Sequence, residues 1–270
     1  MPNSKEFHAR CALGRRNLTR AVGVALGALM AISLAGKPAA ARRGGGGGGG
    51  KRRCFLRGTR IRTCAGYRKI ESLAVGDLVP ARFAGMTPIK LVGHYHWRRA
   101  DPHEPWASAV KPVRIARSAL DDNVPGADLY VTPSHALFID GMLVRAGSLV
   151  NGITITTDDA NDREELEYFH IELESHDVIE AEGAPCETLQ GDREIDVWSG
   201  GDVCRHQVPQ MPCAPILSFN GGRSEVRSRL RSAVSPFVDR RLPLDVIRDK
   251  LEDRALALRG SASSRTGVAA

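Results

Sequence analysis

The feature that most constrains the fold is a series of short β-type segments, separated by turns, that starts at Cys54 and continues to about residue 190. Residues 59–63 alternate in character, as a half-buried strand does. Asp140-Gly141, between two apolar runs, is a strong signal for a two-residue hairpin turn. The segments lack the sustained period of long helices, so the sequence predicts an all-β domain over residues 54–200. The other expected strands cover residues 67–70, 89–92, 113–115, 129–131, 153–157 and 167–173.

A C-terminal extension over residues 201–260 has a different pattern. Two sets of apolar residues recur there at spacings of three or four, which is typical of amphipathic helices. Pro243 suits the first position of the second helix, and Gly260 is expected to end it. We therefore expect two short amphipathic helices and then a disordered tail, residues 261–270. The apolar sets are Val226, Leu230 and Val234, then Leu244, Ile247, Leu251, Ala255 and Leu258.

Two interpretations of these helices stay open. Most apolar stripes of this kind pack on the domain that carries them. The charged faces contain several basic residues, so a docking surface for a partner or an anionic membrane is the alternative. The basic residues are Arg227, Arg229, Arg231, Arg248 and Lys250.

The first 41 residues have the order of a secretory signal peptide. Arg15-Arg16 precedes an apolar run over residues 21–36, and small residues follow at positions 39–41. The run is too short to span a bilayer comfortably as a permanent helix. The paired arginines resemble those of a twin-arginine signal, so we expect the export machinery to carry the chain to the periplasm or the outside of the cell.

Residues 42–53 form a glycine-rich linker that also ends the basic part of the chain. Seven consecutive glycines lose much entropy on ordering and offer no side chains to pack, so a flexible arm is expected. The first 53 residues carry a net charge of +10, which leaves about −3 for the other 217 residues. A nucleic-acid-binding domain needs a basic face on its folded part, so no nucleic-acid partner is expected.

The candidate catalytic residues are a cysteine and polar residues on separate β segments. A lone cysteine is most often a small buried hydrophobe. A cysteine that can be joined by histidines from other segments provides a nucleophile, a base and an orienting group. Tyr168 and His170 fall on one face of the expected strand 167–173. The candidates are Cys54, Thr132, His135, His170 and His176.

The order of these segments resembles the Hint family, the self-processing domains of Hedgehog proteins and inteins, and the bacterial Hint-domain proteins in particular. The resemblance rests on the segment that starts at Cys54, on Thr132-Pro133-Ser134-His135, and on residues 168–183. It implies a disc-like β fold that brings the first and last strands together at one site. It also implies that Cys54 attacks the carbonyl of Arg53 and converts the amide into a thioester.

The resemblance further implies a role for each polar candidate. His135 would protonate the departing nitrogen, and Thr132 would hold or polarise the scissile amide. His170 would act as the base for Cys54 or for an incoming nucleophile. His176 stands where related domains often have a histidine.

Full splicing is not expected, because the chain contains no His-Asn pair of the kind that ends inteins. We therefore expect a single-turnover self-cleavage whose substrate is the chain's own N-terminal segment, and whose thioester is resolved by water or an external nucleophile. An exported, non-catalytic module that acts through its C-terminal helices is the main alternative, and an extracellular cysteine hydrolase is a third. No cysteine or carboxylate stands at ligand spacing from His94 and His96, so no metal and no cofactor are expected.

Overall fold

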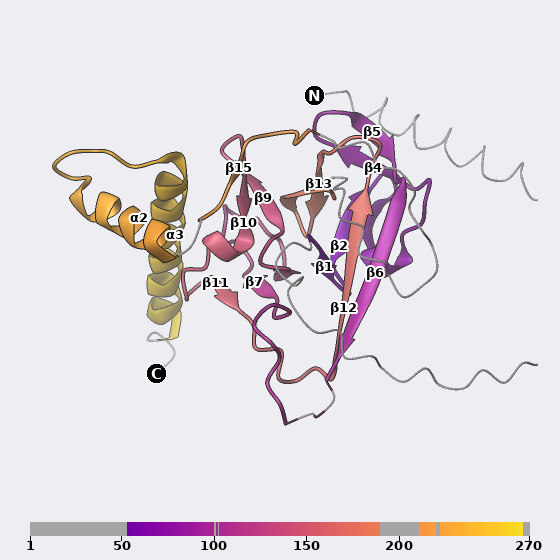
Figure 1. Ribbon diagram of the computed structural model, residues 1–270, viewed down its shortest axis with the longest axis horizontal. Coiled ribbons are helices and arrows are strands. Elements are labelled where there is room, and N and C mark those ends of the chain that lie inside the picture. The colour runs from indigo at the N-terminus through magenta and orange to yellow at the C-terminus, as the bar shows by residue number, and fades with distance from the viewer. Residues whose placement is uncertain (1–52, 100, 102, 190–210, 220–221, 267–270) are drawn as a thin grey trace, which may run out of the picture. The chain divides into compact units, whose positions relative to one another are not determined.

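The computed structural model describes residues 53–99, 101, 103–189, 211–219 and 222–266. The expected signal peptide, the linker up to residue 52, the domain boundary at residue 200 and the last four residues lie outside these ranges. Strands make up most of the regular secondary structure in the described chain, and two helices follow them, so the expected fold class is confirmed (Figure 1).

The first sheet has six antiparallel strands. β6 and β12, far apart in the sequence, run side by side over eight residue pairs, which is the longest strand pairing of this sheet (Figure 1). β1 lies between β8 and β12, so the first strand of the domain is held by two much later ones. In spatial order the strands are β11 (Ile155–Thr157), β7 (Val113–Ile115), β8 (Leu129–Val131), β1 (Phe55–Leu56), β12 (Glu165–Glu172) and β6 (Leu91–Arg98).

The second sheet has seven strands, and a separate hairpin accompanies it. β15 pairs in parallel with β10, whereas the other neighbours in this sheet are antiparallel. The order is β15 (Ile216–Leu217), β10 (Met142–Arg145), β9 (Ala136–Ile139), β14 (Ala184–Glu187), β13 (Val178–Ala181), β2 (Arg60–Thr63) and β3 (Gly66–Lys69). The hairpin consists of β4 (Leu78–Ala81) and β5 (Gly85–Pro88). Two 3₁₀ turns cover Ile70–Ser72 and Ala146–Ser148.

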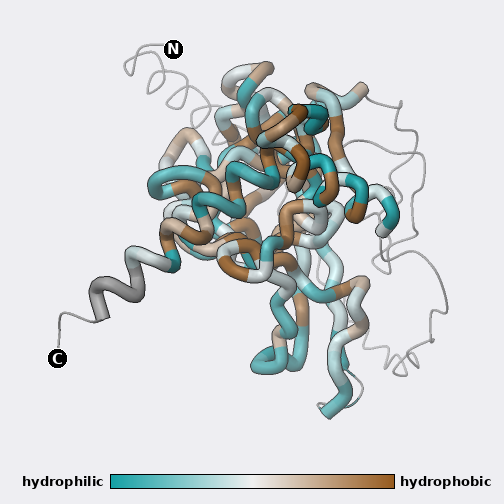
Figure 2. Tube along the Cα trace, turned by 90° about the vertical axis from the view of Figure 1, so that its left-hand side faces the viewer, coloured by the Kyte–Doolittle hydropathy of each residue, from teal (hydrophilic) through white to brown (hydrophobic). Residues whose placement is uncertain are grey.

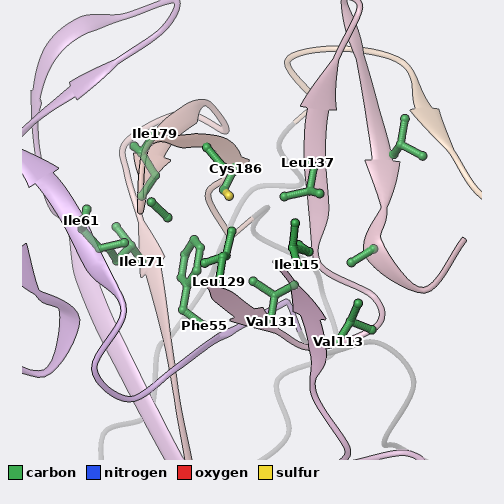
Figure 3. Packing of buried hydrophobic residues seen from close by; sticks show 14 of the residues in the cluster. Phe55, Ile61, Val113, Ile115, Leu129, Val131, Leu137, Ile171, Ile179 and Cys186 are labelled. Atoms are coloured by element: carbon green, nitrogen blue, oxygen red, sulfur yellow. The ribbon is translucent and has the colours of Figure 1, made fainter. Parts of the chain in front are cut away.

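Side-chain alternation along the strands builds one main core. In β2 the arginines are exposed while Ile61 and Thr63 are buried, and Figure 2 shows hydrophilic and hydrophobic residues alternating along the chain. Phe55, Leu129, Val131 and Ile171 belong to this core and are drawn together in Figure 3. Burying apolar side chains in this way is the main favourable term in folding. The core therefore ties the start of the domain to its last strands.

The hairpin turn predicted at Asp140-Gly141 is confirmed. Both residues have positive φ, 49° and 83°, as a type I′ turn requires. β9 and β10 pair in register on either side, with Ile139 opposite Met142.

The second helix, α3 (Pro243–Thr266), packs on the domain as expected. Leu244, Ile247 and Leu251 are buried in the main core. The helix has 24 residues rather than a few turns, and it continues past Gly260, so the predicted stop at that glycine is wrong. A glycine inside a helix costs only about 1 kcal/mol relative to alanine, which does not end a helix by itself.

The first helix, α2 (Gly222–Val234), presents its apolar stripe to solvent. Val226, Leu230 and Val234 are 59%, 60% and 49% exposed, so this stripe does not pack on the domain. The buried contact of α2 is polar, because the Nη1 of Arg248 in α3 donates to the Oγ of buried Ser228 at 2.7 Å. Within the described residues, no helix is long and apolar enough to cross a membrane.

Candidate active site

Three of the candidate residues lie in one row across the first sheet. Phe55 is paired with Val131 on one side and with Phe169 on the other. Continuing this register by one residue places Cys54 between Thr132 and His170. Cys54 is 1% exposed, so the peptide bond that precedes it enters the interior of the protein.

Thr132 holds both sides of the Cys54 main chain. The amide N–H of Cys54 donates to the Thr132 Oγ1 at 3.0 Å, and the Thr132 N–H donates to the carbonyl oxygen of Cys54 at 2.9 Å. The nitrogen of the Arg53–Cys54 bond is therefore fixed in direction by a buried hydroxyl. This position agrees with the holding role that the resemblance implies for Thr132.

His135 lies in the turn that begins at Thr132 and packs its ring 4.3 Å from that of Phe55. Its pKa is lowered to about 4, chiefly by burial; the charge of Glu187 and the main chain of Arg53 act against this, and the positive charge of Arg53 adds to it. Neither ring nitrogen makes a hydrogen bond of normal geometry with the described residues. At neutral pH the site therefore holds an uncharged imidazole next to the main chain of Arg53, and one of its ring nitrogens can accept a proton.

The imidazole of His170 lies beside the thiol of Cys54. Its Nδ1 lies 4.0 Å from the Sγ of Cys54, and both side chains are buried. Gly93 on β6 is its cross-strand partner, and a Cβ at Gly93 would lie 2.0 Å from the ring atoms Cε1 and Nε2. The imidazole occupies the space that any other residue at position 93 would fill.

His176 faces a carboxylate that sequence reasoning missed. Its Nδ1 accepts a hydrogen bond from the Cys213 N–H at 3.1 Å, so its Nε2 carries the proton and lies 3.4 Å from the Oε2 of Glu187. Glu187 ends β14, is 1% exposed, and accepts the N–H of Ala136 at 2.7 Å through Oε1. The described contacts of His176 are thus with Glu187 and Cys213, one step away from the thiol.

The charge of Glu187 is stabilised by groups on several elements. Burial alone would raise its pKa, but the neighbouring His176, the positive charge of Arg53 and the N–H of Ala136 hold the pKa below its ordinary value, and His135 adds to this only when it is protonated. The Nε of Arg53 lies 3.6 Å from its Oε1. Residues on both sides of the Arg53–Cys54 bond are therefore surrounded by the Thr132–His135 turn, β12 and the end of β14.

Comparison with known families shows the family to which the chain belongs. The family described as the Hint domain matches residues 53–193, which is more than half of the chain. The chain belongs to the Hint-domain family. The predicted resemblance is thereby confirmed, and with it a general capacity for autoprocessing.

Solved structures with a similar fold are inteins and an intein-like domain. The crystal structure of the gp41-1 intein is 19% identical, with a TM-score of 0.36, and the match covers 50% of this chain and 98% of that one. The bacterial intein-like domain from Clostridium thermocellum is 15% identical, with a TM-score of 0.35 and coverages of 51% and 99%. A DnaB intein from Synechocystis is 12% identical, with a TM-score of 0.34 and coverages of 50% and 99%. No curated protein matches the chain.

Tyr168 supports the site of this Hint domain without offering a base. It lies in the same buried cluster as Cys54, and its hydroxyl donates to the Val110 carbonyl at 2.7 Å. Burial and the neighbouring Cys54 raise its pKa, so the hydroxyl stays protonated. Across the described part of the chain, no group of three His, Cys, Asp or Glu side chains is placed to hold a metal ion.

Proposed function

We propose that this Hint domain cleaves its own chain between Arg53 and Cys54 through a thioester. The observation that carries the proposal is the row in which Thr132 holds the Cys54 amide while His170 Nδ1 lies 4.0 Å from the Cys54 Sγ. A thiol with an ordinary pKa needs a base to become a nucleophile, and His170 is in position to take its proton.

The first step is an acyl shift from nitrogen to sulfur. The Sγ of Cys54 attacks the carbonyl carbon of Arg53 through a five-membered ring, a carbon–sulfur bond forms, and the carbon–nitrogen bond breaks. The thiol proton passes to His170, and the departing nitrogen gains a proton, so the step is an isomerisation. The negative charge that develops on the Arg53 oxygen raises the proton affinity of nearby His135, which takes up a proton from solvent and delivers it to the departing nitrogen. His170 returns the thiol proton to solvent, so no proton is gained or lost overall.

The thioester is resolved without splicing. Water or an external nucleophile adds to the Arg53 carbonyl, the carbon–sulfur bond breaks, and the thiol of Cys54 is restored. With water, one peptide bond is hydrolysed, and the domain begins at Cys54. Because the released segment is covalently part of the chain, each molecule reacts once.

The mass of the purified protein tests this proposal. Protein expressed from residue 42 should accumulate a species that begins at Cys54, and added thiol or hydroxylamine should accelerate its appearance. The variant Cys54→Ala should remain intact, and His135→Ala should cleave roughly 10²–10⁴-fold more slowly, as expected on loss of a general acid. An unchanged mass of the wild-type protein after prolonged thiol treatment would refute the proposal.

The outward face of α2 favours a second function, contact with an anionic membrane surface. α2 carries four arginines and one glutamate, and exposed apolar residues continue beyond it at Phe237, Val238 and Leu242. An apolar stripe bordered by arginines suits the boundary between acidic headgroups and acyl chains. The contact of α2 with the domain is polar and does not bury this stripe. Moving the stripe from water into a membrane surface would therefore not disrupt the packing of the domain.

Vesicle flotation tests whether the exposed stripe of α2 binds an anionic membrane or another copy of the protein. The protein should bind vesicles rich in phosphatidylserine and not vesicles of phosphatidylcholine, and Leu230→Glu should abolish binding. Val75→Glu, at an exposed valine outside the helices, is the matched control and should bind as the wild type does. Equal binding to both vesicles, no effect of Leu230→Glu, or concentration-dependent dimers that Leu230→Glu dissolves would each overturn the membrane assignment.

A further inference from the structure

Glu187 is the most conspicuous polar group of the site that the acyl shift itself does not use. Its carboxylate is 1% exposed, and burying a charge is costly unless a counter-charge compensates it. Its described polar partners are the Ala136 N–H, His176 and the guanidinium of Arg53.

Arg53 is an unusual partner, because it lies two residues before β1 and belongs to the segment that cleavage would release. Arginine side chains are seldom fully buried without a partner, yet that of Arg53 is only 11% exposed. The same guanidinium also acts on the charge state of His135, which places it within the site rather than beside it. The negative charge of Glu187 is therefore compensated by the guanidinium of Arg53, which lies on the substrate side of the proposed cleavage site.

We infer that Glu187 forms a specificity site for a positively charged side chain, a guanidinium above all, at the residue before Cys54. This inference rests on the proposed self-cleavage and names the class of segment that the domain accepts. An uncharged residue at position 53 leaves the buried Glu187 carboxylate with His176 and the Ala136 N–H as its described polar partners, without the guanidinium. An acidic residue there places two carboxylates together in the interior, which is strongly unfavourable.

The geometry also predicts a graded preference. Nε of Arg53 lies 3.6 Å from Oε1 of Glu187, so the interaction is chiefly one of charge. Lysine supplies the charge as a compact ammonium but without the planar group of donors, so it should serve in part. Glutamine keeps length and polarity but removes the charge, which makes it the most informative replacement.

The first experiment measures thiol-induced cleavage for a panel at position 53 of the full chain. We expect Arg53→Lys to cleave a few-fold more slowly, Arg53→Gln roughly 10- to 100-fold more slowly, and Arg53→Glu more slowly still, since losing a hydrogen bond or pair with a charged group commonly has an effect of this size. Arg57→Gln is the matched control. Arg57 pairs with Glu167 at 2.5 Å on the surface, and its loss should leave the rate unchanged.

The second experiment assigns the preference to Glu187 by a double-mutant cycle. In a Glu187→Gln background, Arg53→Gln should cost no further loss of rate, because the charge that it paired with has gone. Cleavage of Arg53→Gln and Arg53→Glu at the wild-type rate, or a full Arg53→Gln penalty in the Glu187→Gln background, would overturn the inference. The position-53 panel decides on its own if Glu187→Gln does not fold.

A third measurement separates this inference from the proposed cleavage. In uncleavable Cys54→Ala protein, Arg53→Gln should lower the melting temperature more than Arg57→Gln does, because only the first change leaves a buried carboxylate without its counter-charge. Equal melting temperatures would overturn the specificity site whether or not the wild-type protein cleaves itself. A wild-type chain that never cleaves but shows the larger shift for Arg53→Gln would refute the acyl shift while keeping Glu187 as a site for the guanidinium.

Discussion

Replacing Gly93 with alanine should abolish most of the self-cleavage without touching any reacting atom. The added Cβ would lie 2.0 Å from the Cε1 and Nε2 of His170 and 2.8 Å from its Cδ2, whereas such contacts are essentially never closer than 3.0 Å. The ring must therefore retreat by about 1 Å or more. Gly93 and Cys54 flank His170 on opposite sides, because β12 runs between β6 and β1, so the ring is driven out of its position 4.0 Å from the Cys54 Sγ, where the proposed mechanism requires it to take the thiol proton.

The expected loss of rate is that of a misplaced general base, roughly 10²–10⁴-fold. Overpacking also lowers stability by about 1–3 kcal/mol, so the rate is to be measured by intact mass at a temperature at which circular dichroism shows the variant folded. Gly126→Ala is the matched control. Its Cβ would meet nothing closer than the Glu182 carbonyl oxygen at 3.6 Å, an ordinary contact, so it should cleave normally.

A double variant shows whether the effect passes through His170. In a His170→Ala background the added methyl has no ring to displace, so Gly93→Ala should cause no further loss of rate and little loss of stability. Cleavage of Gly93→Ala at the wild-type rate would refute this view of the site, as would a large extra loss in the His170→Ala background.

Two further predictions rest on the structure, and a third rests on the sequence of the first 41 residues. His135 has a pKa of about 4 in the folded protein, below its ordinary 6.5, so the unfolded chain binds more protons than the folded one between these pH values. The stability of Cys54→Ala protein should therefore fall by up to about 3 kcal/mol as the pH drops from 6.5 to 4. Denaturant titrations should show that His135→Gln removes most of this pH dependence. Ile247→Ala should cost about 2–5 kcal/mol because Ile247 lies in the main core, whereas Leu230→Ala on the exposed stripe should stay within about 0.5 kcal/mol, both read from chemical denaturation. If residues 1–41 direct export, N-terminal sequencing of periplasmic and cytoplasmic fractions should find the chain in the periplasm with its leader removed; protein found only in the cytoplasm would contradict this.

The strands that the sequence predicted are those with local signals. β7 and β8 lie where short apolar alternations placed them, and the Asp140-Gly141 turn needs only its own two residues. β14 was missed because Pro185 argues against a central strand, yet β14 lies between β9 and β13. Such pairings depend on partners far along the chain, which short-range patterns do not encode.

The site shows the same division. Cys54, Thr132, His135 and His170 could be nominated because they stand in a recognisable order, and the structure brings them together. His176 was nominated too, but its described contacts are with Glu187 and Cys213 rather than with the thiol. Glu187 has no motif of its own. The available signal was a single acid at the end of a short run of small apolar residues, and its importance comes from the distant groups that β14 and β9 bring to it.

The span of the site has a consequence for the order of events during synthesis. The bond after Arg53 is surrounded by groups that extend in sequence to Glu187, and β1 has no neighbours in its sheet until β8 and β12 exist. A ribosome adding 5–20 residues per second needs roughly 7–27 s to make the intervening 134 residues. Throughout that interval the nascent chain keeps its N-terminal segment attached. The proposed release of the segment could thus begin only after β14, the last strand of the site, has left the ribosome and folded.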